Sequence, residues 1–340
     1  MRKLSDYNFD LPEELIAQTP LENREDSRLM VLKGDDIIHT DIHHFIDHLS
    51  DNDVLVFNKS RVIPARIPFK NENGNAKEIF LSKKNTDGSW DCLVHPGKYF
   101  KEGRVFDLPG NVKAKIMKVN EDWSRSILFS SGDNFDFSSW LQKYGEVPKP
   151  TYIKSIEDAS RYQTVFAEEG NSVAAPTAGL HFTHELLEKI QKKGIEIYFV
   201  HLDVGVGTFM PVKFEDITDH NMHSERFFLT EETADALNKA KKKGKRVISV
   251  GTTSTRVLES CADNKGELLA QSGETDIFIY PGYTFKFIDA LFTNFHTPYS
   301  TLLMLVSAFA GKEKIFHAYS EAVKDKYRFY SFGDAMFIEN

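Results

Sequence analysis

The chain has 340 residues, of which 41% are hydrophobic and 27% are charged, values typical of a globular protein with about two domains. The formal net charge of −8 argues against a protein that coats nucleic acid nonspecifically, although a local positive patch remains possible. No apolar run is long enough for a membrane span, no secretory signal follows Met1, and Cys92 and Cys261 match no metal or redox spacing. We therefore expect a reduced, cytoplasmic protein.

The first sixty residues predict mixed α/β structure. A short helix is expected after Asp10, with Pro12 near its first position. Two strands over 28–33 and 37–40 flank a glycine-containing turn, and the apolar run 54–57 is typical of a buried strand.

Residues 62–150 differ in sequence pattern from the preceding part, because short strand-like runs alternate with turn residues at regular spacing. Within 112–116 apolar and basic residues alternate, as on a half-buried antiparallel strand. A short helix is expected over 140–144, and the proline-bearing segment 147–150 is interpreted as an exit linker. This pattern predicts a small antiparallel β-barrel.

From Arg161 onward, long helices alternate with apolar strands. The simplest interpretation is a mixed α/β domain built from residues 1–61 and 151–340, with the β-barrel of residues 62–150 inserted in it. The expected elements are a helix capped by Thr183 and ended by Gly194, a strand over 195–200, a helix over 231–243 ended by Gly244, a strand over 247–250, an apolar helix from Ser300 to about Gly311, and a helix over 313–326.

The segment 172–183 is the first that suggests a binding function. It places small residues, one proline, two threonines and His181 directly ahead of the helix that begins at Thr183. Small residues allow the backbone to approach a ligand closely, with free N–H groups at a helix N-terminus. A tight packing turn is the alternative interpretation.

Three further segments, 203–209, 219–225 and 251–256, are rich in polar groups. The first and third directly follow predicted strands, and ligands of open α/β sheets gather at the carboxyl edge of the strands. We therefore expect a pocket there, although each segment alone is also compatible with a tight turn. Gly205-Val206-Gly207 lacks the third glycine of a dinucleotide site, and 251–254 lacks the Gly-Lys-Ser/Thr of a phosphate loop, which disfavours a kinase or ATPase.

The histidines in these segments have both structural and functional interpretations. His220 and His223 lie close to acidic residues, but no third histidine or cysteine completes a zinc ligand set, so polar hydrogen bonding is favoured over a metal. For His181 and His296 the default is a hydrogen-bonded, partly buried histidine. Arg256 suits a carboxylate or phosphate clamp and equally suits a helix-surface ion pair.

Short motifs that recur in one order are spread over nearly the whole chain, in segments 10–18, 58–66, 161–166, 172–183, 219–225, 251–256, 273–276, 292–296 with Pro298, 300–302 and 331–336. Together, these motifs resemble one family, the S-adenosylmethionine:tRNA ribosyltransferase-isomerases of queuosine biosynthesis. One departure is Asp203, where the family's Leu-His-Val-Gly motif leads us to expect a histidine.

The resemblance implies a specific reaction. The ribosyl part of S-adenosylmethionine moves to the aminomethyl group of a 7-deazaguanine at the tRNA wobble position and rearranges, giving epoxyqueuosine, adenine and methionine. The cosubstrate donates its ribose, no metal or tightly bound cofactor is implied, and we expect a monomer.

The reaction assigns candidate roles to residues of the matching segments. A base must remove a proton from the 5′ carbon, and the departing adenine needs a donor or fixed dipoles. The candidates for the base are His181, His223, His296, Asp203 and Glu225. The candidates for cosubstrate binding are Thr177 and Gly179 near adenine, Thr252, and Arg256 or Arg161 for the methionine carboxylate. The candidates for base stacking are Tyr162, Phe182 and Phe209, and those for tRNA phosphates are Lys59, Arg61 and Arg66.

Two other functions remain as alternatives. A tRNA-binding protein without catalysis would use the barrel to grip the anticodon stem. An S-adenosylmethionine-dependent RNA methyltransferase would need a glycine-rich first loop followed by an acidic strand end, and no such pattern is recognisable.

Overall fold

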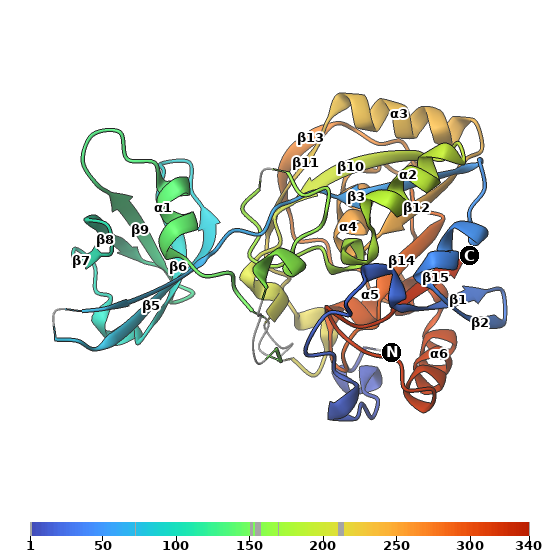
Figure 1. Cartoon of the computed structure of the whole chain (residues 1–340), viewed down its shortest axis with the longest axis horizontal. Helices are drawn as coiled ribbons and strands as arrows, with labels where there is room; N and C mark the ends of the chain where they lie inside the picture. Colours follow the sequence, from blue (N-terminus) through green and yellow to red (C-terminus); the bar gives the residue numbers. More distant parts are fainter. Residues whose placement is uncertain are drawn as a thin grey trace.

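A computed structural model describes residues 2–71, 73–149, 152–153, 158–168, 170–209 and 214–339 of the chain. A large α/β body is joined to a smaller six-stranded sheet that projects from one end (Figure 1). This arrangement confirms the predicted fold class, a mixed α/β part with an inserted antiparallel, barrel-like sheet. No described helix is long and apolar enough to cross a membrane.

The body is built on a nine-stranded mixed sheet whose strands come from both ends of the chain. Its order is β13-β11-β10-β3-β12-β14-β15-β1-β2, and the four strands β10, β3, β12 and β14 run parallel to one another. The strands are β1 (Arg28–Lys33), β2 (Asp36–Asp41), β3 (Asp53–Asn58), β10 (Glu196–Leu202), β11 (Glu225–Leu229), β12 (Arg246–Val250), β13 (Gln271–Thr275), β14 (Ala290–Asn294) and β15 (Ala335–Glu339).

Both faces of this sheet are covered, which explains why its central strands are continuously apolar. Along β3, Val54 and Val56 pack into one buried cluster while Leu55 and Phe57 pack into the other, as the period of two residues requires. The covering α-helices are α2 (His184–Lys192), α3 (Glu231–Lys242), α4 (Thr252–Cys261), α5 (Thr301–Ala310) and α6 (Lys312–Lys324).

The helix-capping predictions are confirmed. The Thr183 side chain accepts a hydrogen bond from the Leu186 N–H at the start of α2, and Ser300 accepts one from the Leu303 N–H at the start of α5. Short 3₁₀ turns link the larger elements: η1 (Leu4–Tyr7), η2 (Glu13–Leu15), η3 (Arg24–Asp26), η4 (Ile42–His48), η5 (Gly97–Tyr99), η6 (Ala159–Tyr162), η7 (Thr177–His181), η8 (Val206–Phe209) and η9 (Ile217–Asp219).

The helix expected after Asp10 is reduced to the three-residue turn η2. The reason is that the following backbone pairs with a distant segment instead of continuing a helix. Ile16 forms a parallel bridge with Phe329, the Ala17 N–H donates to the Phe329 carbonyl, and the Phe329 N–H donates to the Leu15 carbonyl.

The projecting sheet has its own buried core. Along β8 the valine, alanine and isoleucine at 112, 114 and 116 are buried while Lys113 and Lys115 are exposed, which confirms the predicted alternation. Its order is β4-β5-β6-β9-β8-β7, with strands β4 (Arg66–Lys70), β5 (Ala76–Lys84), β6 (Trp90–His95), β7 (Val105–Leu108), β8 (Val112–Val119) and β9 (Arg125–Ser130), followed by helix α1 (Phe137–Tyr144).

A polar network ties the chain that leaves the body for the projecting sheet, at Ser60, to residues 171–172 and to Asp203 after β10. The Ser60 hydroxyl lies 2.7 Å from the Ser172 hydroxyl and donates to the Asp203 carboxylate at 2.8 Å. The Asn171 N–H donates to the same carboxylate oxygen at 2.8 Å. We call these four residues the neck. The limits 62 and 150 of the inserted part stay a prediction, because Pro150 in the expected exit linker lies outside the described residues.

Candidate active site

A cavity of about 500 Å³ opens at the carboxyl edge of the parallel strands. Its wall includes Val204 after β10, Gly251 after β12 and Phe295 after β14. The expectation of a pocket at this edge is therefore confirmed, and its physical basis is that parallel strands end side by side.

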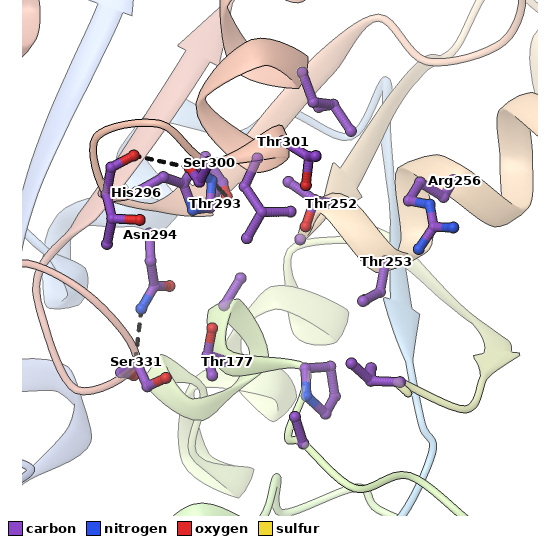
Figure 2. A pocket seen from close by; sticks show the side chains of 18 of the residues that line it. Thr177, Thr252, Thr253, Arg256, Thr293, Asn294, His296, Ser300, Thr301 and Ser331 are labelled. Atoms are coloured by element: carbon purple, nitrogen blue, oxygen red, sulfur yellow. Dashed lines mark hydrogen bonds between the residues drawn. The ribbon is translucent and has the colours of Figure 1, made fainter. Parts of the chain in front are cut away.

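The cavity gathers side chains from segments that are far apart in the sequence (Figure 2). The residues singled out from the sequence that line it are Tyr162, Thr177, His223, Glu225, Thr252, Arg256 and His296. Those that do not line it are Gly179, His181, Asp203, Arg161, Phe182, Lys59, Arg61 and Arg66. The side chain of Phe209 lies outside the part of the chain that the structure describes.

The start of helix α4 forms one wall. Gly251 connects β12 directly to α4 at φ +88°, and a Cβ there would lie 3.3 Å from the Ala178 Cβ, so both the backbone angle and the close approach favour glycine. No side chain caps this helix, and among the described residues no acceptor receives the N–H groups of Thr252, Thr253 or Ser254. Such free donors at a positive helix end favour an anionic ligand group.

Arg256 and Glu225 form a buried ion pair on the same side of the cavity. Arg256 donates to one oxygen of the Glu225 carboxylate, and the Gly205 N–H donates to the other at 2.8 Å. Arg256 also donates to the Thr275 carbonyl at 3.3 Å, while its Nε has no acceptor. The pair therefore ties α4, β11 and the loop after β10 together, and both Glu225 oxygens are already engaged.

His296 follows β14 and is buried in the cavity wall. One ring nitrogen lies 3.0 Å from the Thr293 hydroxyl, and its backbone N–H donates to the Tyr319 hydroxyl at 2.9 Å. Burial lowers the pKa of His296 to about 3. The ring is therefore neutral at physiological pH, with one nitrogen left to contact a ligand.

His181 lies behind the wall and reaches the cavity through Asn294. Its Nε2 lies 3.3 Å from the Asn294 Oδ1, and the Asn294 amide nitrogen donates to the Tyr330 and Ser331 carbonyls at 3.0 and 3.3 Å. Because that nitrogen is the donor, the Oδ1 accepts from His181. Burial lowers the pKa of His181 to about 4, against the opposing effect of the Asn294 hydrogen bond.

His223 lies at the exposed mouth of the same cavity. A Cβ on Gly207 would come within 2.2 Å of the His223 ring, so the loop after β10 can pack against this histidine only with glycine at that position. The neighbouring His220 also lines the cavity, and burial, followed by the charge of His223, lowers its pKa. Among the described residues, no three His, Cys, Asp or Glu side chains lie together as metal ligands would.

Tyr152, Tyr162 and Tyr330 form an aromatic wall of the cavity, and sequence reasoning singled out only Tyr162 of the three. The rings of Tyr152 and Tyr330 are 3.9 Å apart between centroids, and the Tyr152 hydroxyl lies 2.5 Å from the Ser331 hydroxyl. Tyr299 and Tyr330 have φ of 61° and 74°, a left-handed conformation that is costly for a tyrosine and clusters at functional sites. Tyr162 is buried, which raises its pKa to about 12. The sequence feature that could have pointed to Tyr330 is the adjacent segment 331–336, which resembles the family.

Asp203, which does not line the cavity, belongs to the neck. Asp203 accepts hydrogen bonds from Ser60, Asn171 and His201, the last at 2.9 Å. Burial raises the pKa of Asp203, but the hydrogen bond and charge of His201 and the other donors outweigh it, so the pKa lies below its ordinary value. Asp203 thus ties Ser60, on the outgoing chain, to Asn171, while its neighbour Val204 lines the cavity.

Four of the five cations proposed for substrate contacts lie outside the cavity wall, and all four have partners. Lys59 pairs with Glu168 at 2.5 Å, and Arg66 pairs with Glu78 and Glu146 at 2.6 and 2.7 Å. The other two donate to backbone carbonyls, Arg61 to Ala167 and Glu168, and Arg161 to Leu21 and Glu22.

Comparison with known proteins agrees with the resemblance seen in the sequence. The family model described as queuosine biosynthesis protein matches residues 4–338. The crystal structure of an S-adenosylmethionine tRNA ribosyltransferase from Thermotoga maritima is 37% identical, with a TM-score of 0.55, over 98% of this chain and 99% of that one. The chain therefore belongs to the queuosine biosynthesis protein family.

Proposed function

We propose that this chain is a tRNA ribosyltransferase-isomerase. It transfers the ribosyl group of S-adenosylmethionine to 7-aminomethyl-7-deazaguanine at the tRNA wobble position and isomerises it, giving epoxyqueuosine-tRNA, adenine and methionine. The observation that carries the proposal is the single cavity that Thr177, His223, Arg256 and His296 share, in a chain 37% identical to an S-adenosylmethionine tRNA ribosyltransferase.

The methionine carboxylate of the cosubstrate binds at the start of α4 in this proposal. The free N–H groups after Gly251 and the Thr252 hydroxyl supply donors there, and the helix dipole favours the negative charge. Arg256 orients this wall through Glu225 and retains an unpaired Nε. Since both oxygens of Glu225 are engaged, Glu225 acts as a positioning residue in this scheme, not as the base.

The histidines divide the proton chemistry. His223 is exposed to solvent at the cavity mouth, so it can take the proton from the ribose 5′ carbon and pass it to water. Neutral His296 and the hydroxyl of Thr177 provide hydrogen bonds for the departing adenine. The aromatic wall of Tyr152, Tyr162 and Tyr330 provides the apolar surface for a purine ring.

Further parts of the proposal concern the state of the enzyme. It acts as a monomer in the cytoplasm on tRNA. It needs no tightly bound cofactor, since the cosubstrate itself brings both the ribosyl group and the sulfonium leaving group.

A labelling experiment tests the proposal. Precursor tRNA is mixed with S-adenosylmethionine labelled in either the ribose or the methyl group. The proposal expects released adenine, ribose label in the tRNA and methyl label in methionine. Binding of tRNA without adenine release would instead identify a non-catalytic tRNA-binding protein, and methyl label in the RNA would identify a methyltransferase.

A further inference from the structure

Trp123 is the most exposed large hydrophobic side chain of the described residues. It is 78% exposed, whereas the other two tryptophans, Trp90 and Trp140, are 3% and 7% exposed. Trp123 lies in the turn between β8 and β9 of the projecting sheet. An indole side chain is normally at least partly covered, so its position in water calls for a physical explanation.

The turn holds Trp123 in a fixed, unfavourable backbone conformation. Trp123 has φ +66°, a left-handed angle that a bulky residue rarely adopts. Its N–H donates to the Asn120 carbonyl at 3.0 Å, and the Asp122 carboxylate accepts from the Ser124 N–H and hydroxyl at 3.0 and 2.7 Å. Arg125 donates to the Trp123 carbonyl at 2.5 Å. These hydrogen bonds therefore hold Trp123 in its unfavourable conformation, whereas a flexible loop would relax out of it.

The turn lies at the end of the projecting sheet that contacts the body. The Asp91 carboxylate accepts from Asn85 and Asn120, which joins the β5–β6 and β8–β9 turns. Next to the first turn, Lys83 pairs with Glu274 of β13 in the body at 2.6 Å.

The charge of Asp122 also links the second turn to the cavity. Burial raises the pKa of Asp122, but its hydrogen bonds to Ser124 and, more weakly, the charge of His223 lower it below its ordinary value. Glu274, the partner of Lys83, also accepts from the hydroxyl of Ser224 at 2.7 Å, and Ser224 adjoins His223 at the cavity mouth, so the turn that carries Trp123 lies on the side of that mouth.

The projecting sheet also differs in charge from the rest of the protein. Residues 62–149 contain 14 Lys and Arg against 11 Asp and Glu, a net charge of +3, which leaves −11 for the remainder of the chain. Lys113, Lys115 and Lys118 are exposed along β8, beside Met117, which is 43% exposed. Positive charge interleaved with exposed apolar and aromatic groups matches a single-stranded nucleic acid.

We propose that Trp123 is a stacking platform for an unpaired RNA nucleotide close to the one that enters the cavity. The inference rests on the proposed function in that the RNA is the anticodon loop of a tRNA. The indole stacks on the base while the β8 lysines face the phosphates. Base–aromatic stacking tolerates any sequence, so this contact holds the loop in place without selecting its bases.

Affinity measurements with Trp123→Ala, Trp123→Phe and Leu269→Ala test the platform. Leu269 is a matched control, since it is 57% exposed but follows α4 in the body. Loss of stacking is expected to weaken tRNA binding about 5- to 150-fold in Trp123→Ala, to raise the KM for tRNA, and to leave the KM for S-adenosylmethionine unchanged. Trp123→Phe keeps most of the affinity, and Leu269→Ala behaves as the wild type.

Intrinsic fluorescence gives a second readout that does not depend on turnover. Because the other two tryptophans are buried, tRNA is expected to quench the emission of Trp123 in the wild type, and this quenching is absent in Trp123→Phe. Wild-type affinity in Trp123→Ala, or quenching that persists in Trp123→Phe, would overturn the inference and indicate a different partner for this surface. Failure of the proposed function can be told apart from failure of this inference, because the wild-type protein would then release no adenine.

Discussion

Arg256 of α4 and Glu225 of β11 form an ion pair whose side chains are 8% and 6% exposed. A single substitution leaves one charge buried without its partner, which typically costs about 3–5 kcal/mol. Glu225→Gln should therefore lower the free energy of unfolding by an amount of this order. The double variant Glu225→Gln/Arg256→Met removes both charges and should recover a large part of the loss in urea denaturation. If the losses simply add, the two residues are not coupled.

Thr252→Val tests the proposed carboxylate subsite while preserving side-chain shape. Loss of a hydrogen bond to a charged group should raise the KM for S-adenosylmethionine about 10- to 150-fold. An S-adenosylmethionine analogue without the carboxylate should bind the wild type and the variant equally weakly. Thr301→Val, in the same cavity at the start of α5, is the control and should change neither the KM for S-adenosylmethionine nor the affinity for the analogue. Equal weakening of both ligands by Thr252→Val would place the carboxylate elsewhere.

His181→Ala tests whether this histidine acts through Asn294. We expect the single-turnover rate of ribosyl transfer to fall at least about tenfold, because the amide loses one of the three hydrogen bonds that orient it. Asn294→Ala should cause a similar loss, and the double variant should be no slower than either single variant. Additive losses would show that the two residues contribute independently. Near-normal turnover in His181→Ala would remove it from the mechanism.

Stability should fall in mild acid because of His181 and His296. Their pKa values in the folded protein are about 4 and 3, below the ordinary value of 6.5. Above pH 6.5 both states are neutral and the histidines have no effect. Between pH 6.5 and about 4 the unfolded chain binds protons that the folded chain does not, so each histidine lowers the unfolding free energy by up to about 1.4 kcal/mol per pH unit.

Urea unfolding between pH 7.5 and 4.5 measures this slope. His181→Gln and His296→Gln each remove one titrating ring and should have a shallower pH dependence than the wild type, whatever their stability at pH 7.5. An unchanged slope in both variants would contradict the assignment of neutral, buried rings.

Local sequence patterns correctly predicted those helices and strands whose structure depends on residues within the element itself. Thr183 and Ser300 carry caps within their own helices, and the alternation along β8 follows from its own side chains. Strand β13 shows no such pattern, since four of its five residues are exposed and it pairs only at the edge of the sheet. The sequence predicts a helix where the structure has only the turn η2, because the backbone after the turn forms hydrogen bonds with Phe329, which is distant in the sequence.

The site was predictable to the extent that it follows from the sheet. Parallel strands bring the ends of β10 and β12 together, so Thr252 and Arg256 could be expected near the loop after Leu202. The pairing of Tyr152 with Tyr330 depends on tertiary packing and leaves no periodic signal in the sequence. The same holds for His181, whose position behind Asn294 follows from the packing of η7 against β14.

The neck joins the start of the projecting part to the loop that lines the cavity. The Asp203 carboxylate accepts from Ser60 on the outgoing chain and from Asn171, and the next residue, Val204, lines the cavity. A shift of the outgoing chain would strip hydrogen bonds from a largely buried anion, which is costly. The loop after β10 is therefore fastened to the base of the projecting sheet, so a displacement of that base would displace the cavity wall with it.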